Sequence, residues 1–144
     1  MPINPNSSAR IDEFLSELAR NDVRALYQSR SLYLINALKV SIRTTTKPGP
    51  IFWYDVSASV LDRTDYFIYQ TDSKNHFALI QSAYLIRIYD QLMDSNRPKA
   101  KQFYIYWKSK KLSSNPAFSE SISSHCCSTV PGQCDGKWRS VLRG

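Results

Sequence analysis

The sequence predicts an α/β protein of the layered α+β type. We expect N-terminal helices and then a mixed central sheet of about four strands, with a helix between strands three and four. Three changes of apolar period support this class. Apolar residues first recur at helical spacing, change to strand-like alternation at Ile51, and return to helical spacing after Ala83 before a final aromatic strand.

The N-terminal third predicts two helices. The first begins near Ser8, and its apolar side chains recur at positions that share one helical face: Ile11, Phe14, Leu15 and Leu18. The second spans 23–43, where an apolar stripe has a basic periphery. Three Thr, two Pro and one Gly in 44–50 end this helix, because such a composition favours a loop.

The rest of the predicted domain alternates strands with one helix. In chain order we expect strands at 51–57, 65–70 and 76–81, a helix after Ala83, a basic loop at 94–101 and a strand at 103–112. The turn between the second and third strands is rich in Asp, Ser and Asn, which bond locally to the backbone. Its register places Asp65 across from Ser82 and beside Gln81.

The last part of the chain differs in composition from the rest. Residues 113–144 are rich in Ser and hold Cys126, Cys127 and Cys134. An odd number of cysteines, two of them adjacent, is no disulfide framework. A zinc site would need His125 as a fourth ligand, and the spacing matches such sites poorly. We therefore expect a single domain over 8–112, followed by an irregular tail that adds little to the core.

The charge indicates a polyanionic partner. The chain has 19 Lys and Arg against 12 Asp and Glu, a formal charge of +7 over 144 residues. Such a bias favours nucleic acid or an anionic membrane surface. No apolar run approaches the roughly 18 residues that cross a bilayer, and the polar N-terminus lacks a signal-peptide core, so we expect a cytoplasmic protein without a membrane partner. With only four Gly, the chain has no glycine-rich phosphate loop.

The element order, together with RTDYFI at 63–68 and FALIQSA at 77–83, resembles the PD-(D/E)xK, or restriction-endonuclease-like, nuclease superfamily. Small single-domain homing endonucleases are the most similar type within it. The resemblance covers about residues 9–112. It implies that Asp65 is the aspartate of the site and that Gln81 takes the second position. The family's lysine, two residues later, falls on Ala83, which is a departure from the pattern.

The resemblance also implies a reaction and a cofactor. Glu13 or Glu17 would supply a helical carboxylate, and together with Asp65 they would hold Mg²⁺, which prefers oxygen ligands. Lys108, on the last strand, would replace the missing lysine. The implied activity is Mg²⁺-dependent hydrolysis of phosphodiester bonds in double-stranded DNA by a homo-oligomer, either a dimer or a tetramer.

The predicted DNA contacts are basic or polar. They lie at the hairpin tip, in the basic loop and at the end of the last strand: Lys74, Asn75, Arg97, Lys99, Lys101, Lys110 and Lys111. Such side chains neutralise phosphates, and a polar hairpin tip enters a groove as a β-ribbon. Two alternatives stay open: a non-catalytic DNA-binding or regulatory module on the same scaffold, and a protein-interaction domain whose charge is incidental.

Overall fold

The computed structural model of this chain describes residues 5–45, 47, 49–114, 117–130 and 138–143, and for 5–8 only the backbone. Its helices are α1 (Pro5–Arg20), α2 (Ala58–Asp62), α3 (Ser82–Ile88) and α4 (Trp138–Arg143), with 3₁₀ turns η1 (Tyr89–Gln91) and η2 (Ser123–His125). Its strands are β1 (Leu26–Ser29), β2 (Leu32–Ile35), β3 (Leu38–Arg43), β4 (Ile51–Ser57), β5 (Tyr66–Gln70), β6 (His76–Gln81), β7 (Met93–Asp94), β8 (Ala100–Tyr106), β9 (Lys111–Ser113), β10 (Ser119–Ser121) and β11 (Cys126–Ser128).

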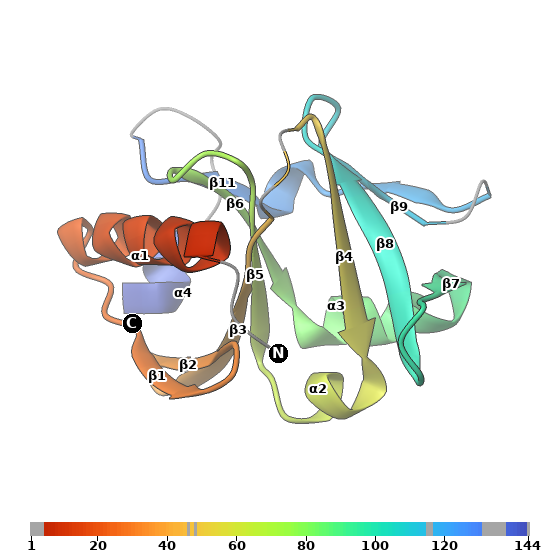
Figure 1. The fold of residues 1–144 in the computed structure, drawn as a ribbon, viewed down its shortest axis with the longest axis horizontal. Coiled ribbons are helices and arrows are strands. Elements are labelled where there is room, and N and C mark those ends of the chain that lie inside the picture. Colours follow the sequence, from red (N-terminus) through yellow and green to blue (C-terminus); the bar gives the residue numbers. More distant parts are fainter. Residues whose placement is uncertain (1–4, 46, 48, 115–116, 131–137, 144) are drawn as a thin grey trace.

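Two sheets and a helical layer stack on one another. The first sheet has six strands in the order β1-β2-β3-β5-β6-β11 and is antiparallel except for the parallel pair β3–β5. The second sheet has five strands, with β10-β9-β8-β4 in order and β7 beside β8. Helices α1 and α4 cover one face of the first sheet, and the second sheet lies on the other side (Figure 1).

Alternation along β5 and β6 creates two cores. Ile68 and Phe77 face α1 and α4, whereas Phe67 and Ile80 face the second sheet and α3. Successive side chains of a strand point to opposite faces, so a sheet covered on both sides is apolar at nearly every position. This explains why β5 and β6 are almost continuously buried.

The α+β class and the mixed sheet pairing are confirmed, and so is the first helix, in which Phe14 and Leu18 are fully buried. The strand at 51–57, the hairpin of 65–81 and the helix between strands are also present. Tyr66 pairs with Gln81, and the Ser82 amide donates to the Asp65 carbonyl at 3.0 Å, as the predicted register requires. The structure has two sheets, of six and five strands, whereas the sequence predicts one sheet of about four strands.

The helix predicted over 23–43 is wrong, because this segment forms the meander β1–β2–β3. On β2 the buried residues alternate with period two, and Tyr33 and Ile35 face the helical side of the sheet. The two tight turns use non-glycine residues in the left-handed region, at Arg30 (φ 52°) and at Asn36 and Ala37 (φ 51° and 62°). Glycine is the usual sequence signal of tight hairpin turns, and its absence here explains why the sequence does not predict these two turns.

The predicted final strand is divided into two. Strand β8 ends at Tyr106, and β9 folds back on it so that Tyr106 pairs with Lys111. Positive φ at Lys110 (54°) makes this turn, again without glycine. Residues predicted to continue one strand therefore form a hairpin.

The described residues of the tail belong to the packed structure. Strand β11 extends the first sheet by pairing with β6, and Cys126 and Cys127 are buried in the two different cores. Trp138 is also fully buried, and its indole N–H donates to the Ser128 carbonyl at 3.0 Å. The described residues of the tail thus contribute a strand and buried side chains, whereas the sequence predicts an irregular segment that adds little to the core. Cys134 lies outside the described residues.

We expect Trp138→Ala to lower the free energy of unfolding by about 3–5 kcal/mol, since large buried aromatic side chains leave cavities of that cost. The ring also packs edge-to-face on Phe77, with centroids 5.6 Å apart. Urea denaturation measures the effect. The control is Trp53→Ala, whose side chain is 48% exposed and should cost far less. Equal effects of the two substitutions would contradict a structural role for the tail.

Candidate functional site

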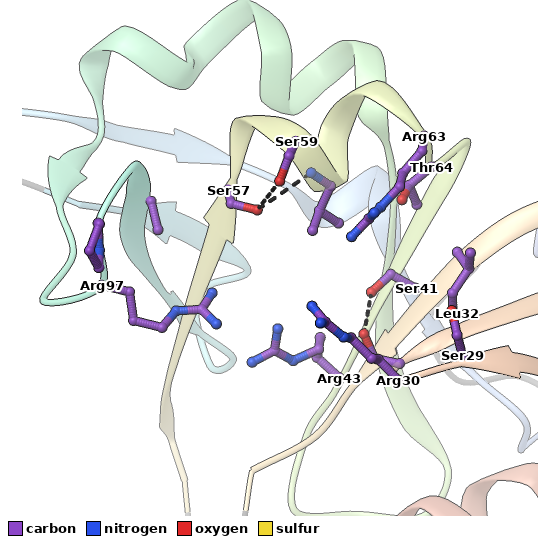
Figure 2. Close-up of a pocket in the computed structure, with 14 residues that line it drawn as sticks. Ser29, Arg30, Leu32, Ser41, Arg43, Ser57, Ser59, Arg63, Thr64 and Arg97 are labelled. Atoms are coloured by element: carbon purple, nitrogen blue, oxygen red, sulfur yellow. Dashed lines mark hydrogen bonds between the residues drawn. The ribbon is translucent and has the colours of Figure 1, made fainter. Parts of the chain in front are cut away.

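A cleft of about 660 Å³ opens between the two sheets where β3 and β4 diverge. The β1–β2 turn, α2 and the loop before β8 complete its walls. Four arginines line it, one from each of four segments: Arg30, Arg43, Arg63 and Arg97. Figure 2 shows the side chains of Arg30, Arg43 and Arg97 directed toward the open centre. None of the described residues that line this cleft carries a carboxylate.

Strand β3 explains why the cleft is polar. Val40 and Ile42 pack into the core beneath α1, so Ser41 and Arg43 must face the second sheet. At this position a closed sandwich would have apolar side chains. Here the Ser41 hydroxyl instead lies 3.2 Å from the hydroxyl of Ser31. The gap between the sheets is therefore lined with hydrogen-bonding groups.

Arg30 reaches the cleft from a strained turn. It has a φ of 52°, a left-handed conformation that Gly or Asn adopts more readily than Arg. The turn is held to β3 because the Ile42 amide donates to the Ser31 carbonyl at 2.9 Å. Strained backbone persists where surrounding structure determines it, and it is common at functional sites. In this turn, the strain places a guanidinium in the cleft.

Asp55 ties the two sheets together at the edge of the cleft. Its Oδ1 lies 2.7 Å from the Arg97 guanidinium and 3.6 Å from that of Arg43. One carboxylate is thus shared between a cation of β3 and a cation of the loop before β8. Neither Arg30 nor Arg63 forms an ion pair with any carboxylate in the described part of the chain. The cleft consequently keeps an excess of positive charge.

Two buried tyrosines lie near Arg43. Burial raises the pKa of Tyr54 and of Tyr69, and the Arg43 guanidinium opposes this rise in both. Both phenols therefore stay protonated at neutral pH, and the Tyr54 hydroxyl donates to the Gln70 carbonyl. These neutral hydroxyls add no negative charge beside Arg43, so Asp55 remains its carboxylate partner.

Thr64 adds an unsatisfied donor to the cleft wall. Its residue is only 6% exposed, and its Oγ1 has no hydrogen-bond partner among the described residues. Buried hydroxyls are nearly always paired in native structures. The backbone here is fixed, because the Ser82 hydroxyl donates to the Thr64 carbonyl. This oxygen has almost no accessible surface, so an anion in the cleft would reach it only after the side chain rotated.

The side chain of Asp65, the predicted catalytic aspartate, is hydrogen-bonded to the backbone of β3. Its Oδ2 accepts the Lys39 amide at 2.8 Å, while its own amide donates to the Lys39 carbonyl at 2.7 Å. These bonds extend the parallel pairing of β3 and β5 by one residue. Gln81 lies beside it, exposed at the end of β6, as the register predicts.

The helical carboxylates lie at the other end of the hairpin. Glu17 pairs with Arg20 at 2.5 Å and with Lys74, at the hairpin tip, at 3.5 Å. The five residues of β5 separate this tip from Asp65 by about 17 Å. Glu13 is exposed on the same helix. The structure thus does not bring Asp65 together with either glutamate.

The residues present do not fit the implied Mg²⁺ site. In the described ranges, no three His, Cys, Asp or Glu side chains gather as a metal ligand set. Lys108 lies in the turn after β8, beyond the β8 end that pairs with the start of β4. Asp65 follows the opposite end of β4, after α2. We derive no metal-dependent step from this arrangement.

Of the predicted DNA contacts, only Arg97 lines the cleft. Lys99 follows it in the same loop, and Lys101, on β8, pairs with Asp94 at 2.9 Å. Asn75, at the hairpin tip, is bonded within the fold, because the Thr129 hydroxyl donates to its amide oxygen at 2.6 Å.

The remaining predicted contacts are elsewhere. Lys110 donates to the Trp107 carbonyl at 2.7 Å and lies over its ring, and Lys111 is exposed on β9. Sequence reasoning missed Arg30, Arg43 and Arg63. A strand interpretation of 26–43 would have placed Arg30 in a turn and Arg43 at a strand end.

Comparisons with known proteins gave no relative: no family model, curated protein or solved structure matched the chain. None of the helices in the described part of the chain has the length and apolar character needed to cross a membrane.

We expect Asp65→Ala to lower the free energy of unfolding by about 1 kcal/mol, because the Lys39 amide loses its side-chain acceptor. Thermal or urea denaturation measures this change. Asp62→Ala is the control, since Asp62 is an exposed carboxylate at the end of α2. The structural role of Asp65 is refuted if its substitution leaves stability unchanged.

Arg30→Gly should leave the free energy of unfolding unchanged or raise it by up to about 1 kcal/mol, because glycine adopts positive φ without strain. Ala37→Gly, at φ 62° outside the cleft, is the matched control and should behave in the same way. Arg30→Val should be destabilising, since β-branched residues disfavour this conformation. Equal melting temperatures for the Gly and Val variants would contradict a strained turn.

Proposed function

We propose that this chain is a DNA-binding module that holds backbone phosphates in the cleft between its two sheets. The observation that carries the proposal is the convergence of four arginines from separate segments on a cleft without lining carboxylates in the described residues. One guanidinium group can donate two parallel hydrogen bonds to two oxygens of a phosphate. This bidentate geometry favours Arg over Lys at phosphate-binding sites.

The hydrogen-bonding groups of the wall suit the same ligand. Phosphate oxygens are acceptors, and the hydroxyls of Ser57, Ser59 and Thr64 lie among the arginines (Figure 2). Such contacts position a nucleic acid without reading its sequence.

The charge around the cleft favours a polymer over a small anion. Lys99, in the loop of Arg97, and Lys101, at the start of β8, line a neighbouring cavity of about 630 Å³, in which Asp94 pairs with Lys101. With a formal charge of +7 on the whole chain, the protein attracts a polyanion over distances beyond direct contact. A basic surface that extends past one pocket matches successive phosphates of a DNA strand.

The other expectations have less support in the geometry. The restriction-endonuclease-like fold and the homo-oligomer stay predictions. The Mg²⁺-dependent cleavage also stays a prediction, and Asp65, Glu13 and Glu17 do not converge in a way that would support it. Incubating plasmid DNA with the protein and Mg²⁺ or Mn²⁺ distinguishes a nuclease from a binding module. A protein-interaction domain with incidental charge would show little binding to duplex DNA even at low salt.

Double substitution of Arg30 and Arg63 by Gln should weaken binding to a short duplex about 10-fold or more at moderate salt. It should also lower the slope of log K against log salt by about 2, since each neutralised phosphate contributes roughly 0.9. Fluorescence anisotropy with a labelled duplex at several salt concentrations measures both quantities.

The control removes the same charge from the β8–β9 turn region, by Lys110→Gln together with Lys111→Gln. This variant should keep most of the affinity, because these lysines do not line the cleft. The proposal is refuted if both double variants weaken binding equally, or if the parent protein fails to bind duplex DNA at low salt.

A further inference from the structure

The outer face of β4 and β8 carries an exposed tryptophan and an exposed isoleucine beside two half-buried tyrosines. Trp53 is 48% exposed and Ile51 is 41% exposed, and they pair across the strands with Tyr104 and Tyr106, respectively. The rings of Trp53 and Tyr104 lie 4.8 Å apart at an angle of 48°. We call these four residues the aromatic strip.

The core does not require this strip. On β4, Phe52, Tyr54 and Val56 face inward and fill the core between the sheets. Trp53 points to the opposite face, where it costs free energy to expose to water. Contiguous exposed apolar side chains on a soluble domain commonly mark a binding surface.

The strip is continuous with the cleft along one strand. Alternation puts Ile51, Trp53, Asp55 and Ser57 on the same face of β4, about 7 Å apart in steps of two residues. Ser57 lines the cleft, and Asp55 pairs with its arginines Arg43 and Arg97. Trp53 is therefore the next side chain on that face beyond Asp55, whose carboxylate holds two of the arginines.

We propose that the aromatic strip stacks unpaired bases of the same DNA whose phosphates lie in the cleft. Every base has a π-face, so aromatic stacking binds single-stranded segments with little sequence preference, and arginines beside it hold the backbone. This inference rests on the proposed DNA binding and names the kind of DNA that the protein prefers. The preferred ligand is a duplex that carries a single-stranded extension, because bases inside a duplex are already stacked on each other.

The continuity with positive charge identifies the occupant. A second copy of this chain would bring its own basic cleft residues close to those of the first, and like charges repel. A nucleic acid satisfies both parts of the surface, since it offers phosphates to the arginines and flat apolar bases to Trp53. A dimer through the strip is the competing outcome of the test.

The experiment compares a blunt duplex, the same duplex with a single-stranded extension, and the single strand alone. For Trp53→Ala we expect affinity for the two ligands with unpaired bases to fall about 5- to 100-fold, while affinity for the blunt duplex changes less than about 2-fold. Trp53→Phe should keep most of the affinity, because phenylalanine also stacks. The parent protein should lose tryptophan fluorescence on binding the extension, and Trp53→Ala should not.

The outcomes separate the two proposals. If Trp53→Ala binds all three ligands as the parent does, the strip proposal is refuted, while the salt-dependent binding through Arg30 and Arg63 is untouched. If Trp53→Ala weakens all three equally, or instead abolishes a dimer seen by sedimentation, the strip is no base-stacking surface. Failure of the parent to bind any of the three ligands would overturn both proposals.

Discussion

The structure depends on β3 having one apolar face and one polar face. Val40 and Ile42 fix the strand against α1 and α4. The same backbone then forces Ser41 and Arg43 toward the second sheet, where an apolar pair would have extended the core. Because a charged guanidinium is costly to bury without a partner, the two sheets stay apart at this position. The cleft follows from the alternation of a single strand.

The parts of the fold that the sequence predicts well are those with local signals. Helix α1 has an apolar stripe at helical spacing, and the β5–β6 hairpin has apolar strands around a turn of Asp, Ser and Asn. The meander of 26–43 has neither signal. Its turns place Arg30, Asn36 and Ala37 at positive φ, where glycine would have marked them. Its short strands also contain Leu, Lys and Arg, which favour helices as isolated residues.

The site was harder to predict than the fold because its residues gather from distant segments. Arg97 was identified from a basic loop, but Arg30 and Arg63 lie isolated in the sequence and meet only through the pairing of β3 with β5. Asp65 shows the converse. Its place at the start of a strand is typical of a catalytic carboxylate, yet its hydrogen bond to the Lys39 amide gives it a role in strand pairing.

Asp55 explains how the arginines of the cleft coexist in the folded protein. Guanidinium groups from β3 and from the loop before β8 repel each other across the cleft, and the shared carboxylate offsets part of this repulsion. Asp55 is itself positioned by β4, whose inward residues are locked in the core. Two arginines are therefore held in place, so an anion that bound them would cost less side-chain entropy. A phosphate in the cleft would meet groups whose positions are already set by the folded chain.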